Sequence, residues 1–226
     1  MSDEVKIVNG IVYDPTNKVS GKVKDICIRD GKVVESVSSK AKIIDAKGMI
    51  VMPGGIDIHC HIAGPKVNIA RKLLPEDHRL DPQFKNEHTR SGVGGVVPST
   101  FATGYRYATM GYTTCMEAAV PPLAARHALE ELYDTPVVDN GYYVLLGNNL
   151  FLQSLIAEGR MEEFKNAVGW WLNATKAYTV KIVNPGGDEP WKGHRNTNVK
   201  DIDEDSKATD VAPRKVIKAF VDAVHE

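Results

Sequence analysis

The sequence lacks long hydrophobic runs. No apolar stretch in its 226 residues approaches the roughly 20 residues that a helix needs to span a bilayer, so we expect no membrane-spanning helix. Residues 1–6 are charged and contain no apolar core, which argues against a signal peptide. Together these features predict a cytoplasmic protein.

Cysteine is scarce. The chain contains three, Cys27, Cys60 and Cys115, which lie far apart and form no C-x-x-C pair. Such usage is typical of a reducing compartment, and it offers no ligand set for an iron–sulfur cluster or a structural zinc site. We therefore expect no redox cofactor in this chain.

Excess charge is absent as well. Lysine and arginine number 28 against 29 acidic residues, which gives a formal net charge of -1, and the basic residues form no block. This balance argues against binding to nucleic acid or to an anionic membrane. A composition of 42% hydrophobic and 25% charged residues is ordinary for a globular protein of one or two domains.

The most informative stretch is VMPGGIDIHCHIAGP at residues 51–65. Its apolar residues predict a short buried strand that follows a Pro-Gly-Gly break. Because residues i and i+2 of a strand share a face, His59 and His61 are expected on one face and Cys60 on the other. Two converging imidazoles can hold a divalent metal. Two unrelated histidines are the alternative, but the position at the end of a strand favours a metal site.

Lys181 is the second candidate, in an apolar segment predicted as a strand over 178–184. Burial of an unpaired ammonium is costly, and an ammonium has no lone pair with which to bind a metal. A salt bridge at the strand end is one explanation. Glu117, near the end of a strand predicted over 113–119, is also expected to form a strand-end salt bridge, with support of a metal ligand as the alternative.

Residues 53–61, PGGIDIHCH, resemble the metal signature on the first barrel strand of the amidohydrolase superfamily. Residues 58–65, 71–77 and 97–107 are similar to one branch of it, the A subunits of formylmethanofuran dehydrogenase. The likeness runs through most of the chain and is more specific than the His-x-His pair alone.

The resemblance implies an α/β fold. Residues 1–52 would form the N-terminal part of a small β-sandwich, with hairpin turns at Asn9-Gly10 and Asp30-Gly31. Residues 53–226 would form the first four strands of a TIM-like (β/α)8 barrel. Since such a barrel needs about 200–250 residues, we expect only its first half here. Later family strands carry further histidine ligands and an aspartate base.

For the site, the resemblance implies two divalent zinc ions held by His59, His61 and Lys181. Lys181 would be carboxylated by CO2 and would bridge both ions. The activity implied is the interconversion of formate plus methanofuran with N-formylmethanofuran, in CO2 fixation and methanogenesis.

The implied partners are the other subunits of that complex. One is a tungsten or molybdenum subunit that supplies formate, with metal-pterin and iron–sulfur cofactors confined to partner chains. Another is a chain or segment that completes the barrel, without which this chain is expected to be inactive. Two alternatives remain: a cyclic amidohydrolase similar to dihydropyrimidinase or dihydroorotase, and a catalytically incomplete half-barrel with a structural role.

Overall fold

The computed structural model describes residues 3–73, 100–183, 185, 201–206 and 209–225. The chain divides into two compact units, Met1–Gly54 and Gly55–Glu226. Residues 74–77 and 97–99, which belong to the stretches at 71–77 and 97–107 that carry part of the resemblance, fall outside the described residues, as do His78, His88 and His194. No helix among the described residues has the length and apolar character needed to cross a membrane.

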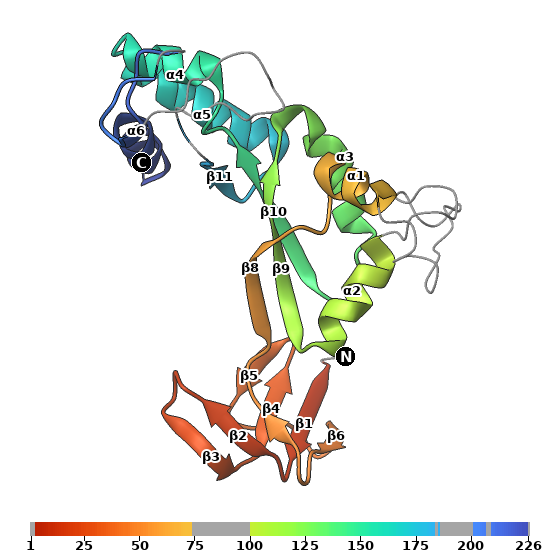
Figure 1. Ribbon diagram of the computed structural model, residues 1–226. Helices are drawn as coiled ribbons and strands as arrows, with labels where there is room; N and C mark the ends of the chain where they lie inside the picture. Colours follow the sequence, from red (N-terminus) through yellow and green to blue (C-terminus); the bar gives the residue numbers. More distant parts are fainter. Residues whose placement is uncertain (1–2, 74–99, 184, 186–200, 207–208, 226) are drawn as a thin grey trace. The chain divides into compact units, whose positions relative to one another are not determined.

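The first unit is built from two small sheets (Figure 1). One sheet has the strand order β5-β4-β1-β6, and the other has the order β3-β2-β7. The strands are β1 (Glu4–Val8), β2 (Ile11–Asp14), β3 (Val19–Val23), β4 (Ile26–Arg29), β5 (Lys32–Val34), β6 (Lys42–Asp45) and β7 (Ile50–Val51).

One of the two predicted hairpins is present. Asp30 and Gly31 have φ angles of 50° and 75° and join the antiparallel strands β4 and β5, as a type I′ turn requires. The hairpin predicted at Asn9-Gly10 was wrong, because β1 and β2 belong to different sheets. Gly10 serves close packing instead: a Cβ there would lie 2.5 Å from a methyl of Val51 on β7.

The second unit contains a four-stranded parallel sheet in the order β11-β10-β9-β8 (Figure 1). Its strands are β8 (Gly55–Cys60), β9 (Tyr112–Val120), β10 (Asp139–Leu145) and β11 (Thr179–Lys181). The spatial order follows the order along the chain, and all pairings are parallel. The C-terminal ends of the four strands therefore meet at one edge of the sheet, which is where the candidate residues lie.

Helices connect these strands and pack on the sheet. They are α1 (Pro65–Leu73), α2 (Thr100–Thr109), a 3-10 turn η2 (Pro122–Ala124) leading into α3 (Ala125–Tyr133), α4 (Leu150–Ala157), α5 (Met161–Thr175) and α6 (Pro213–His225). Buried side chains of strands and helices form one core, in which the rings of Phe164 and Phe220 meet edge-on with centroids 5.0 Å apart. This core gives the strand ends a rigid support.

Several predicted boundaries need correction. The strand predicted over 178–184 is Thr179–Lys181, and the strand predicted over 113–119 is Tyr112–Val120. Boundaries depend on which backbone groups find partners across the sheet, and sequence periodicity does not report those partners.

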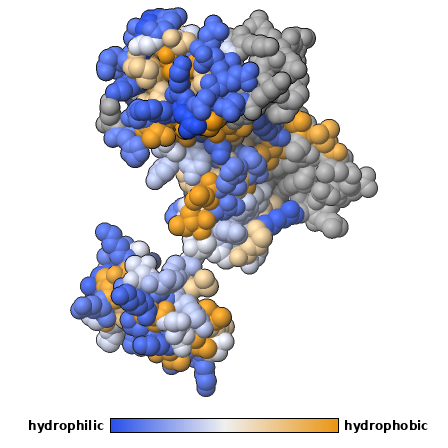
Figure 2. Space-filling model, turned by 60° about the vertical axis from the view of Figure 1, so that its left-hand side comes forward, coloured by the Kyte–Doolittle hydropathy of each residue, from blue (hydrophilic) through white to orange (hydrophobic). Residues whose placement is uncertain are grey.

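Both outer strands of this sheet, β8 and β11, are paired on one side only within the described residues. Ile56 and Ile58 on β8 are 64% and 66% exposed, and Tyr178 beside β11 is 79% exposed. Figure 2 shows orange apolar patches on the surface formed by this unit. Strand edges and apolar side chains left open in this way are suited to receiving further strands.

Candidate metal centre

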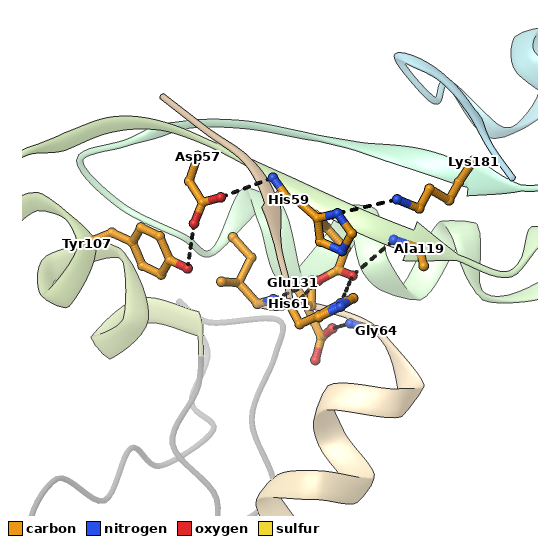
Figure 3. Close-up of polar contacts among 11 residues, drawn as sticks. Asp57, His59, His61, Gly64, Tyr107, Ala119, Glu131 and Lys181 are labelled. Atoms are coloured by element: carbon orange, nitrogen blue, oxygen red, sulfur yellow. Dashed lines mark hydrogen bonds and ion pairs between the residues drawn. The ribbon is translucent and has the colours of Figure 1, made fainter. Parts of the chain in front are cut away.

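Three side chains converge at the C-terminal edge of the sheet (Figure 3). The rings of His59 and His61 have centroids 5.5 Å apart and are nearly perpendicular, at 89°. Nζ of Lys181, from β11, lies 3.4 Å from Nδ1 of His59. All three residues proposed from the sequence are therefore brought together.

The contact between Lys181 and His59 requires a curled sheet. The two residues come from β11 and β8, the outer strands of the four. Neighbouring strands lie about 4.8 Å apart, so three spacings would separate the outer strands of a flat sheet by about 14 Å. Side chains that meet at 3.4 Å must therefore face each other across a concave surface, as in a barrel wall.

Glu117, at the end of β9, holds His61 in place. Its buried carboxylate accepts a hydrogen bond from Nδ1 of His61 at 3.0 Å, and it also accepts from the backbone amides of Ile62 at 2.6 Å and Ala63 at 3.1 Å. Because Nδ1 carries the proton in this arrangement, the Nε2 lone pair of His61 is free for a metal. Glu117 therefore does pair at the strand end as expected, and its partner is a candidate metal ligand.

A second buried carboxylate fixes the next residue of the loop. Glu131 of α3 accepts hydrogen bonds from the amide of Gly64 and, at 2.7 Å, from the side chain of Asn68 on α1. Three successive backbone amides of the loop therefore donate hydrogen bonds to carboxylates from β9 and α3. This satisfies backbone donors that would otherwise be buried without partners, and it makes the turn after His61 rigid.

The side of β8 opposite the histidine rings faces a dry interior. Cys60 and Cys115 are buried there, and burial raises the pKa of the Cys60 thiol to about 12 and that of the Cys115 thiol to about 11. Burial also raises the pKa of Tyr107, which packs against the same core. These groups stay protonated at neutral pH and are not metal ligands in this arrangement.

Lys181 is less enclosed than its apolar segment suggested. It is the last residue of β11 and is half-buried, because the strand ends there rather than continuing to residue 184. The desolvation penalty expected for a lysine inside a strand is correspondingly smaller. What distinguishes Lys181 is its position, with the amine directed at His59 (Figure 3).

These donors suit one side of a divalent metal centre. Two neutral imidazoles are ordinary zinc ligands, and the tautomer of His61 with its proton on Nδ1 leaves Nε2 free to bind the metal. Within the described residues no cluster of three or more His, Cys, Asp and Glu is placed to hold a metal. Two histidines alone are an incomplete ligand set, and an unmodified lysine ammonium cannot add a ligand to it, because it has no lone pair.

The model of the amidohydrolase family matches residues 42–212, which include parts of both units and all three candidate residues. The chain belongs to the amidohydrolase family.

Individual amidohydrolases resemble the chain along nearly its whole length. It is 47% identical over 219 residues to protein FwdA of Methanocaldococcus jannaschii, a match that covers 97% of this chain and 38% of that protein. It is 37% identical over 226 residues to FhcA, from the formyltransferase/hydrolase complex Fhc of Methylorubrum extorquens, covering 98% of this chain and 39% of FhcA. The chain thus spans about two fifths of the length of these amidohydrolases.

A solved structure of the same complex agrees. The crystal structure of the Methylorubrum extorquens formyltransferase/hydrolase complex, determined with methylofuran, matches 98% of this chain with a TM-score of 0.81 at 33% identity. The match covers 40% of the crystallised chain. At this similarity the amidohydrolase α/β fold is shared.

The sequence identified the candidate metal ligands, but it did not identify the buried carboxylates that hold the loop after His61. Glu117 was recognisable only as an acid near a strand end, and Glu131 carried no signal at all, since an acidic residue on a helix is usually exposed. Their burial, 1% and 2% exposed respectively, marks them as structural partners of the loop after His61. That information exists only once β8, β9 and α3 are packed together.

Proposed function

We propose that this chain is the N-terminal part of a formylmethanofuran dehydrogenase A subunit. It would provide the first half of a (β/α)8 barrel and the N-terminal part of the adjoining β-sandwich. The observation that carries the proposal is the contact between Lys181 and His59 across a curled parallel sheet, in a chain with 47% identity to protein FwdA.

The reaction would join formate to the amine of methanofuran, or hydrolyse the resulting N-formyl amide. Two zinc ions, when bound, would supply Lewis acidity and an activated water for making or breaking the C–N bond. The relative of known structure was crystallised with methylofuran, which supports a furan-type carrier as the substrate class here.

The roles of the chain's own residues follow from their contacts. His59 and His61 would be neutral imidazole ligands, and Glu117 would keep the proton of His61 on Nδ1. Lys181 would react as a free amine with CO2, forming an N–C bond and releasing a proton. The resulting carbamate would be an anion with oxygen atoms suited to metal binding, and it would remove a positive charge that repels metal ions.

The remaining ligands and the base would come from the segment that completes the barrel. The open edges of β8 and β11 and the exposed Ile56 and Ile58 are suited to receiving its strands. Formate would be delivered by a tungsten or molybdenum subunit of a cytoplasmic complex. The relative of known structure was crystallised as the complex FhcABCD, which supports a multi-subunit assembly.

The test is a comparison of the isolated chain with the complex purified from its source. The complex should contain two zinc ions per copy of this chain and should hydrolyse an N-formyl amine, whereas the isolated chain should show no turnover. Turnover by the rigorously isolated chain would contradict the proposal of a half-site.

The same experiment separates the alternatives. Hydrolysis of dihydroorotate or a hydantoin in preference to an N-formyl amine would favour a cyclic amidohydrolase. A complex that retains this chain without any metal would favour a structural half-barrel.

A further inference from the structure

The pairing of β8 with β9 contains a feature that simple strand alternation does not predict. Asp57 lies opposite Cys115, and Cys60 lies opposite Glu117. The two β8 residues between Asp57 and Cys60 therefore face the one β9 residue between Cys115 and Glu117. Such an extra residue is a β-bulge, which is rare in parallel sheets and changes the direction of the side chains that follow it.

The bulge decides which way His59 points. With strict alternation, Asp57, His59 and His61 would all lie on one face of the strand. In the structure Asp57 faces the hydroxyl of Tyr107 on α2, whereas the ring of His59 faces Lys181 on the other side of β8 (Figure 3). The extra residue therefore reverses the face of His59 relative to Asp57.

The side chain of Asp57 stabilises this bulge directly. Its Oδ1 accepts a hydrogen bond from the backbone amide of His59 at 3.0 Å. This local contact provides an acceptor for an amide that lies where the regular pairing of β8 with β9 is interrupted. Its Oδ2 accepts a hydrogen bond from the Tyr107 hydroxyl at 3.2 Å. The carboxylate is thus held from both sides, by the strand and by α2.

We propose that Asp57, anchored by Tyr107, is a positioning residue that maintains the β-bulge and thereby turns His59 into the metal site. Both residues would act through the direction of the His59 ring and not as ligands. The proposal rests on the proposed function for the role of His59 as a ligand, but the bulge and its effect on ring direction can be tested without metal.

The first test measures the direction of the ring. In the metal-free 226-residue chain labelled at histidine, nuclear Overhauser contacts should connect the rings of His59 and His61, whose centroids are 5.5 Å apart. Asp57→Ala should abolish these contacts. Asp57→Asn should retain them, because the amide oxygen still accepts from the His59 backbone amide. Retention of the contacts in Asp57→Ala would overturn the proposal.

The second test uses zinc alone as the probe. Asp57→Ala should weaken zinc binding by about 10- to 100-fold, the range typical for loss of a group that supports a ligand, and Tyr107→Phe should weaken it less. Tyr112→Phe is the matched control: its ring packs against Tyr107 with centroids 5.4 Å apart, and its change leaves the hydrogen bond from Tyr107 to Asp57 intact. Thermal unfolding of each variant identifies any that simply fail to fold.

The two hypotheses fail in different ways. If His59→Ala loses zinc while Asp57→Ala and Tyr107→Phe bind it as tightly as the wild type, the positioning role is wrong and the metal site stands. If His59→Ala itself binds zinc normally, the metal site is wrong, and the ring contacts then decide the role of Asp57 on their own.

Discussion

Glu117 and His61 are joined by a hydrogen bond of 3.0 Å between a carboxylate that is almost fully buried and a ring that is half-exposed. This single contact sets the tautomer of His61 and directs its free nitrogen into the site. It also links two neighbouring strands of the parallel sheet, since Glu117 belongs to β9 and His61 directly follows β8.

We expect Glu117→Gln to reverse the tautomer of His61. If the Gln side-chain oxygen still accepts the hydrogen bonds from the backbone amides of Ile62 and Ala63, the Gln NH2 group faces Nδ1 of His61. Nδ1 must then accept a hydrogen bond rather than donate one. The proton moves to Nε2 and zinc binding weakens. Long-range ¹H–¹⁵N spectra of the histidine ring measure the change, with Glu130→Gln on the exposed face of α3 as the control.

Glu117→Ala should also lower the stability of the fold. It leaves the amides of Ile62 and Ala63 buried without their acceptor, at about 1–3 kcal/mol for each group. Urea unfolding should show a free energy of unfolding lower by at least about 2 kcal/mol. A loss no larger than that of Glu130→Ala would mean that the carboxylate is dispensable.

His59→Ala and His61→Ala should each reduce the zinc content of the assembled complex. Each change removes one imidazole from a pair whose rings lie 5.5 Å apart, and the remaining donors cannot hold the ion as tightly. Elemental analysis of the purified complex measures this. His225→Ala, at the exposed end of α6, is the control. Full occupancy in both site variants would exclude these histidines as ligands.

Lys181 should carry a CO2-derived carbamate in the zinc-loaded complex. With ¹³C-bicarbonate, a carbamate carbon signal should appear in the wild type and be absent from Lys181→Ala, which should also lose the second metal ion. A short carboxylic acid should partly restore that ion by filling the vacated space. Lys176→Ala, whose amine bonds Asn173 on the surface, should retain the signal. Electron density that ends at an unmodified Lys181 amine would contradict this prediction.

The thiol of Cys115 should be inert while the protein is folded. It is fully buried, and burial raises its pKa from 9.0 to about 11. At pH values between 9.0 and about 11, the thiol keeps its proton in the native state and loses it in the unfolded state. The free energy of unfolding should therefore fall as the pH rises from 9.0 toward 11.

Iodoacetamide labelling at about pH 8, just below the usual thiol pKa, should modify Cys115 only after addition of urea. Cys115→Ala should flatten the decline of stability above pH 9.0, which urea titrations at several pH values can measure. Rapid labelling of the folded chain would show that β9 opens easily.

Much of the second unit could be predicted from local patterns. The strand β9 lies within one residue of its expected position over 113–119 at each end, because apolar periodicity and Pro or Gly breaks act over a few neighbouring residues. The turn at Asp30-Gly31 was equally accessible, since its positive φ angles depend on those two residues alone. The passage of the chain from one sheet to the other at Gly10 could not be predicted locally, because it depends on the approach of Val51 from a distant strand.

The sequence by itself determined which residues are candidates for a metal site: a His-x-His pair at a strand end and a lysine in a later apolar segment. Tertiary structure alone decided how they are arranged. Lys181 meets His59 across 122 positions, Glu117 meets His61 across 56, and Tyr107 reaches Asp57 across 50. The physical reason is that a side chain's direction is set by strand register and sheet curvature. Both are properties of paired strands, so no single segment of the sequence contains them.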